Sequence, residues 1–120
     1  MAKFRVDFDT VRKIALALPG VEDATAYGSP AFKVNGKLLA CIPINKSAEP
    51  GSLMVRVDFA SRAELLAESP DVYYVTDHYE NYPSVLVRLA LIHPDALRDL
   101  LGMAWRGLTV RKDTAKKRVI

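Results

Sequence analysis

Apolar residues recur at helical spacing near both ends of the chain. In the first segment they occupy positions i, i+3, i+4 and i+7, namely Val11, Ile14, Ala15 and Leu18. Asp9 is the expected N-cap, and Pro19-Gly20 ends this helix. A longer helix is predicted to begin at Pro94, a favoured first helical residue. Its apolar stripe consists of Leu97, Leu100, Leu101, Ala104 and Trp105. Each helix therefore has one face to bury.

Between these helices, short apolar runs are separated by turn residues. The runs with the composition or alternation of strands are Ala24–Tyr27, Ala31–Val34, Lys37–Ile44, Leu53–Asp58, Val72–Thr76 and Val85–Ala90. Asn35-Gly36 predicts a tight hairpin, because both residues tolerate the positive φ of a type I′ turn. A short helix is predicted to start at Ser61, which forms a capping box with Glu64, and to end near Ser69.

The predicted element order is α-β-β-β-β-α-β-β-α. Strands that follow one another through tight turns form antiparallel pairs, and each predicted helix must cover the sheet with its apolar stripe. The sequence therefore predicts an α+β sandwich, a mostly antiparallel sheet with the helices packed on one face.

The distribution of charge changes how the basic composition is interpreted. The 120-residue chain has a net charge of +3, but residues 107–120 alone carry +4 and residues 1–106 carry −1. We predict one α+β domain over residues 1–106 and a basic C-terminal tail over residues 107–120. Cys41 is the only cysteine, and no apolar run approaches the roughly 18 residues of a membrane span. We therefore expect a cytoplasmic protein with no membrane partner and no internal disulfide.

Motifs for enzyme chemistry are weak in this sequence. Gly36-Lys37 lacks the other residues of a phosphate-binding loop, and no G-x-G-x-x-G is present. Cys41 with His78 could supply a nucleophile and a base, but a lone cysteine in an apolar strand is typical of a core residue. The segment from Asp77 to Glu80 has ligand-type side chains but a single histidine, which favours a solvated turn over a metal site. We expect no catalytic residues, no metal and no cofactor.

Strand phase predicts a basic face on the sheet. With Phe32 turned toward the core, Lys33 lies on the opposite face, and the same alternation places three more cations there. The predicted face holds Lys33, Lys37, Arg56 and Arg88, interleaved with Leu39, Met54, Leu86 and Tyr73. Basic and apolar residues mixed on an open sheet are typical of nucleic-acid surfaces. An ordinary hydrated face carries the same residue types, and Asp58 also falls on it, so the residues alone favour the hydrated face.

Two segments carry a resemblance to a known family. They are Leu18-Pro19-Gly20-Val21-Glu22 and the run from Tyr27 to Lys37, in which the matching positions are Tyr27, Gly28, Pro30, Phe32, Lys33, Gly36 and Lys37. With Val85–Leu89 and the final helix, the sequence resembles the MmcQ/YjbR family of small bacterial proteins from Phe8 to Arg106. The resemblance implies a CyaY-like, frataxin-like fold and a DNA-binding role with a double-wing arrangement.

We therefore expect a non-enzymatic DNA-binding protein, a monomer or weak homodimer, with little sequence selectivity. The predicted contacts to nucleic acid are Lys33, Lys37, Arg56, Arg88, Arg106, Arg111 and Lys112. Two alternatives stay open. The same partly apolar face could serve as a protein-interaction or homodimerisation surface. The loop of residues 77–82, with Tyr27 and Trp105, could instead form a small-molecule site or an active site.

Overall fold

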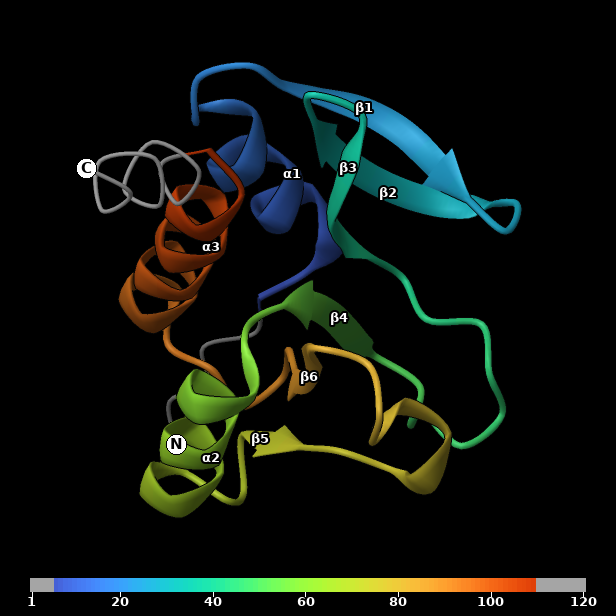
Figure 1. Cartoon of the computed structure of the whole chain (residues 1–120), viewed down its shortest axis with the longest axis vertical. Helices are drawn as coiled ribbons and strands as arrows, with labels where there is room; N and C mark the ends of the chain where they lie inside the picture. Colours follow the sequence, from blue (N-terminus) through green and yellow to red (C-terminus); the bar gives the residue numbers. More distant parts are fainter. Residues whose placement is uncertain (1–5, 110–120) are drawn as a thin grey trace, which may run out of the picture.

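The computed structural model describes residues 6–109 (Figure 1). Its elements are α1 (Phe8–Leu16), β1 (Val21–Ala26), β2 (Ser29–Val34), β3 (Lys37–Cys41), β4 (Ser52–Arg56), α2 (Phe59–Glu68), β5 (Tyr73–Tyr74), the 3-10 helix η1 (Asp77–Tyr79), β6 (Ser84–Arg88) and α3 (Pro94–Thr109). The predicted order of helices and strands is confirmed. Helix α3 continues past the predicted domain end at residue 106, and residues 110–120 of the predicted tail lie outside the described residues.

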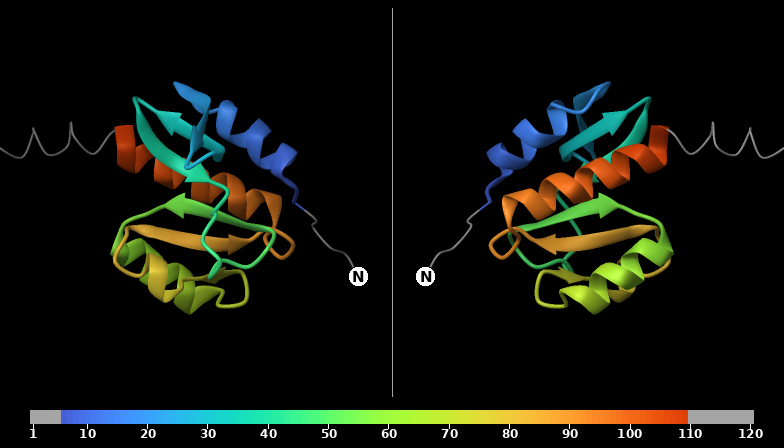
Figure 2. Two further views of the ribbon diagram at one scale, coloured as in Figure 1. Left: turned by 90° about the vertical axis from the view of Figure 1, so that its right-hand side faces the viewer. Right: turned by 90° about the vertical axis from the view of Figure 1, so that its left-hand side faces the viewer.

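The strands form one six-stranded sheet in the order β1-β2-β3-β4-β6-β5. Every neighbouring pair is antiparallel, so the predicted α+β class is confirmed. Figure 2 shows α3 crossing one face of this sheet, while the connection from β3 to β4 passes on the other side. Within residues 6–109, no helix is long and apolar enough to span a membrane.

Two-residue turns join the first three strands. The predicted hairpin at Asn35-Gly36 is confirmed: both residues have positive φ, 53° and 76°, and Val34 lies opposite Lys37. Tyr27 and Gly28 adopt the same left-handed conformation, with φ of 55° and 79°, between β1 and β2. The sequence gives no hairpin signal at this second turn, because tyrosine is not a residue that favours positive φ.

Aspartates cap the first two helices. Each lies two or three residues before the residue at which the sequence predicts the helix to start. Asp7 caps α1 by accepting a hydrogen bond from the Thr10 amide at 2.9 Å, so the prediction of Asp9 was wrong. Asp58 caps α2 by accepting from the Ser61 amide at 2.7 Å, so Ser61 is in the first turn and is not the N-cap. In both helices an aspartate just before the first turn accepts from the free amide three residues ahead. The residues that the sequence predicts as caps, Asp9 and Ser61, lie inside the first turn.

The main core lies between the sheet and the three helices. Helix α3 contributes Leu97, Leu100, Leu101 and Ala104, all buried as predicted. The sheet contributes, from its central strands, Phe32, Leu53, Val55, Val85 and Val87. The ring of Phe8 in α1 stacks on Phe32 with centroids 5.4 Å apart. Apolar burial of this kind is the dominant stabilising term, and it fixes the sheet face on which the helices lie.

Candidate functional site

The sheet face turned away from the helices is covered by the chain itself, so the prediction of an open face was wrong. Its central residues are buried and form a second apolar cluster of Ala31, Cys41, Met54, Tyr79 and Leu86. Two residues from the connections pack on this cluster, namely Ala48 from the connection before β4 and Val75 from the connection after β5. The sequence signal for this cover is that β4 and β6 contain consecutive apolar residues, which is typical of strands buried on both faces.

A shift of register in the β2–β3 pair separates two lysines that were predicted to share a face. The shift lies between Phe32 and Lys33, and beyond it Lys33 pairs with Leu38 while Lys37 pairs with Val34. Directly opposed residues of antiparallel strands lie on one face, so Lys37 is on the helix side and Lys33 is not. The prediction for Lys37 was wrong because a bulge adds one residue and reverses the alternation that follows it.

Two of the apolar residues that were predicted beside the cations lie on the helix side of the sheet instead. Leu39 is fully buried in the core on the helix side, together with its neighbour Ala40. Tyr73 pairs with Val87 and is also on the helix side. Met54 and Leu86 lie on the predicted face, although covered.

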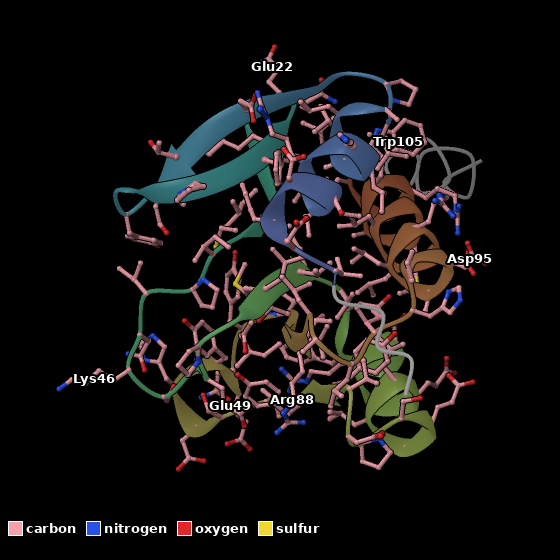
Figure 3. All side chains as sticks on the ribbon, turned by 180° about the vertical axis from the view of Figure 1, so that it is seen from behind. Glu22, Lys46, Glu49, Arg88, Asp95 and Trp105 are labelled. Carbon is pink, nitrogen blue, oxygen red and sulfur yellow. The ribbon has the colours of Figure 1, made fainter. Side chains whose placement is uncertain are left out.

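Arg88 lies on the predicted face, but its guanidinium is directed to other parts of the protein. It donates to Glu49 through Nε at 2.9 Å and Nη2 at 2.8 Å, and through Nη1 to the Asp71 carbonyl at 3.0 Å. Its Cζ lies 4.3 Å from the Tyr74 ring centroid. Figure 3 shows Arg88 and Glu49 side by side. The hydrogen bonds from Arg88 lower the pKa of the Glu49 carboxyl below its usual value. Arg88 therefore fastens the β3–β4 connection to the sheet.

Of the remaining predicted contact residues, Arg56 and Arg106 lie on opposite sides of the sheet. Arg56 lies on the same face as Arg88, with its Cζ 5.9 Å from the Tyr82 ring centroid. Arg106 is exposed in the last turn of α3, on the helix side of the sheet. Arg111 and Lys112 lie outside the described residues. Residues 6–109 hold ten basic and thirteen acidic side chains, so the described part of the chain has a net charge of −3.

The covered face contains a pocket of about 610 Å³. Its floor is formed by Leu38 and Cys41 of β3 and by Met54 of β4. Residues 42–46 form one wall. Aromatic side chains from two separate turns complete the lining, namely Tyr27, His78, Tyr79 and Tyr82. The structure thus brings the loop of residues 77–82 together with Tyr27, as the small-molecule alternative expects.

Trp105 is not part of this pocket, and its inclusion in the predicted small-molecule site was wrong. It lies on α3, across the sheet, where its Nε1 donates to the Pro19 carbonyl at 2.8 Å (Figure 3). This bond joins the last helix to the turn after α1. A tryptophan whose ring packs on the core and whose N–H reaches a carbonyl has a structural role.

The polar groups of the pocket are few, and Lys46 supplies the ammonium group among the lining residues. No aspartate or glutamate is among the lining residues. Figure 3 shows Lys46 pointing away from the body of the protein. The Tyr79 hydroxyl is hydrogen-bonded to the Asn45 backbone, and burial raises the pKa of this tyrosine. The pocket is therefore an apolar space with tyrosine rings at its edge.

This arrangement does not activate Cys41 as a nucleophile. Burial raises the pKa of the Cys41 thiol, which lowers its thiolate fraction, whereas a reactive cysteine needs a lowered pKa. His78, the predicted partner, is exposed and its ring packs edge-on against Tyr79, with centroids 4.7 Å apart. Across residues 6–109, no group of three or more histidine, cysteine or acidic residues could hold a metal ion.

Arg62 of α2 fixes the aromatic wall of the pocket, and the sequence reasoning missed it. Its Nη2 donates to the Glu80 carbonyl at 2.8 Å, and its Nη1 to the carbonyls of Tyr82 and Ser84 at 3.1 Å and 3.2 Å. The facing segments are also joined by the hydroxyls of Ser47 and Thr76, 2.8 Å apart. No sequence signal marks Arg62, because its acceptors are backbone carbonyls that every residue carries.

Comparison with known proteins places this fold in a family. A family model described as YjbR matches residues 16–107. The chain belongs to the YjbR family. The predicted resemblance to the MmcQ/YjbR family is thus confirmed. This chain is 38% identical to the uncharacterized proteins Rv2570 of Mycobacterium tuberculosis and Mb2600 of Mycobacterium bovis, over 82% of its own length and 84% of each relative.

A solved structure shows the same architecture. The crystal structure of Deinococcus radiodurans protein DR2400, with a DUF419 domain, matches this YjbR protein with a TM-score of 0.71 and 21% identity. The match covers 88% of this chain and 80% of the other. At this identity the likeness concerns the fold, and the expected relationship to CyaY and frataxin stays a prediction.

Proposed function

We propose that this YjbR-family protein binds a small, largely apolar molecule in the pocket on the covered face of its sheet. The observation that carries the proposal is the pocket of about 610 Å³, lined by apolar and aromatic side chains from four separated segments. Small-molecule sites are concave, mostly apolar and fitted with a few polar groups, and they fall within about 300–1,000 Å³. The pocket has each of these properties.

The construction of the pocket walls supports this proposal. A pocket serves binding when its walls keep their shape without the ligand. Here Arg62 holds the carbonyls of residues 80, 82 and 84, and Arg88 holds Glu49 at the far end of the β3–β4 connection. The Tyr74 hydroxyl also accepts a hydrogen bond from the Glu49 amide at 2.7 Å. Both covering segments are thus anchored to the rest of the fold, which keeps the pocket walls in place.

The test uses 8-anilinonaphthalene-1-sulfonate as the probe, with one variant that fills the pocket and one that does not. Leu38→Trp places a large ring at the floor, whereas Leu91→Trp changes an exposed leucine outside the pocket. We expect saturable fluorescence enhancement with one site per chain for the wild type and Leu91→Trp, and its loss in Leu38→Trp. Near-ultraviolet circular dichroism confirms that each variant is folded. Saturable binding that Leu38→Trp leaves unchanged would refute the proposal.

Cys41 provides an independent readout of the same site, because it is the only cysteine and lies at the pocket floor. A bound probe should slow the alkylation of Cys41 by iodoacetamide in the native wild-type protein, measured by mass spectrometry. The probe should have no effect on alkylation in urea, where the pocket is absent. Equal alkylation rates with and without saturating probe in the native protein would place the probe elsewhere and count against the pocket.

Nucleic-acid binding is the second candidate, and the observation that favours it is the charge of the C-terminal segment. Residues 110–120 contain five basic side chains and one acidic one, and Arg106 is exposed in the last turn of α3. The described part has a net charge of −3, so we propose contacts from Arg106, Arg111 and Lys112, with Lys33 and Arg56 in a lesser role. Lys37 and Arg88 also stay predictions as contact residues.

Fluorescence anisotropy with duplex and single-stranded oligonucleotides at low salt tests this second candidate. We expect binding that weakens steeply with salt and is lost when residues 110–120 are removed. Sedimentation of the same samples tests the expectation of a monomer or weak homodimer. Binding that the truncation leaves unchanged would contradict a role for the tail, and no binding below about 100 μM would reject the candidate.

A further inference from the structure

Tyr27 is in a backbone conformation that tyrosine disfavours. Its φ of 55° is in the left-handed region, and Gly28 follows at 79° in the same turn. Among the non-glycine residues from 6 to 109, only Tyr27 and Asn35 have positive φ. The two residues occupy the same position in successive two-residue hairpins, β1–β2 and β2–β3. Asparagine is a preferred residue at that position, and tyrosine is not.

The side chain of Tyr27 does not compensate for this strain by packing in the core. It is 84% exposed, the largest exposed fraction among the large apolar and aromatic side chains that remain at the surface. A tyrosine held at positive φ and left in water stabilises neither the turn nor the core. Its ring does, however, line the pocket whose floor is formed by β3 and β4.

We propose that Tyr27 is the stacking residue of the pocket and that the ligand carries a flat aromatic ring. This inference rests on the proposed function. The turn displays the ring at the edge of the pocket, and the lining supplies further aromatic side chains, Tyr82 and His78, from the opposite covering segment. Aromatic rings that meet in offset-stacked or edge-to-face arrangements gain stabilisation beyond that of the apolar area they bury, which an aliphatic chain does not provide. Because no carboxylate lines the pocket, the ring compound is uncharged or anionic.

Three variants separate the ring from the turn. Tyr27→Asn removes the ring and installs the residue that the neighbouring hairpin uses, so it should keep or raise the melting temperature. Tyr27→Phe keeps the ring and the strain and removes only the hydroxyl. Asn35→Tyr places a tyrosine in the equivalent turn, away from the pocket lining, and should lower the melting temperature without affecting binding.

The measurement compares two sulfonates that differ in their apolar part. One is 8-anilinonaphthalene-1-sulfonate, which is aromatic and fluorescent. The other is decyl sulfonate, which is aliphatic, and its binding is measured by how well it displaces the fluorescent probe. We expect Tyr27→Asn to lower the affinity for the aromatic probe about tenfold and the affinity for the aliphatic probe less than about twofold. The affinities of Tyr27→Phe for both probes should stay within about twofold of the wild-type values.

The outcomes distinguish this inference from the proposal on which it rests. Saturable binding by the wild type that Tyr27→Asn leaves unchanged would overturn the role of Tyr27 and leave the pocket in place. Equal weakening of both probes would overturn the aromatic ligand class, since the ring would then act as an apolar wall only. Absence of saturable binding of either probe to the wild type would overturn the proposed function and this inference together.

Discussion

Replacing Arg62 with methionine is expected to lower the free energy of unfolding by about 3 kcal/mol. Methionine keeps the length of the apolar stem but removes the donors. Nη1 contacts three carbonyl oxygens, those of Tyr79, Tyr82 and Ser84, at 3.4, 3.1 and 3.2 Å, and Nη2 contacts Glu80 at 2.8 Å. Since Nη1 carries two hydrogens, about three full bonds form, each contributing about 1 kcal/mol at this half-buried site. Ser84 is fully buried, so its carbonyl loses a partner that water does not readily replace.

Urea denaturation followed by circular dichroism measures this loss, with Arg98→Met as the matched control. Arg98 donates to Asp95 at 2.7 Å, and both residues are in α3. The Arg98 side chain is 60% exposed, so Arg98→Met should lower the free energy of unfolding by no more than about 0.5 kcal/mol. Arg62→Lys should lose most of the same stability, because one ammonium group cannot reach carbonyls spread over residues 79–84. Losses for Arg62→Met and Arg98→Met that agree within about 0.5 kcal/mol would refute this reasoning.

Three further predictions concern the covered face. Leu86→Ala, at a fully buried site, should lower the free energy of unfolding by about 3 kcal/mol, measured by urea denaturation. Leu91→Ala, at a leucine that is 49% exposed, should lower it by less than about 1 kcal/mol. Equal losses of stability would mean that the covered face is not packed. Because hydrogen bonds from Arg88 lower the folded-state pKa of Glu49, the stability from this pair is present above the ordinary glutamate pKa of about 4.3 and is lost as pH falls through the lower folded value. The stability difference between wild type and Glu49→Gln should therefore shrink on acidification below about pH 4, and a constant difference would contradict the assignment. Burial raises the pKa of the Cys41 thiol, so the pH midpoint of its alkylation by iodoacetamide should lie above the value of about 8.5 for a free cysteine, and a lower midpoint would argue for an activated thiol.

Local signals in the sequence are sufficient for most of the fold. The Asn35-Gly36 turn and the stripe from Leu97 to Ala104 depend on residues close together in the chain, and both are confirmed. The caps show the limit of such signals, because several aspartate and serine residues near each helix start can accept the same amide bond. The structure uses Asp7, which accepts from the Thr10 amide, and Asp9 lies inside the first turn.

The candidate site could be predicted only in part. The loop of residues 77–82 and Tyr27 were expected to meet in a small-molecule site, and both line the pocket. Trp105 was placed with them because exposed and core aromatic residues look alike in a sequence. The basic face depended on uninterrupted alternation, and a single bulge beside Phe32 moved Lys37 to the helix side.

The sequence by itself determined which segments become helices and strands, their order and the α+β class, because hydrophobic periodicity and turn residues act over a few positions. Only the tertiary structure decided what covers the second face of the sheet. That cover depends on contacts such as Arg88 with Glu49 and Arg62 with distant carbonyls, which join residues far apart in the chain. Backbone carbonyls and charged pairs leave no periodic mark in a sequence. The pocket therefore becomes visible only when the chain is folded.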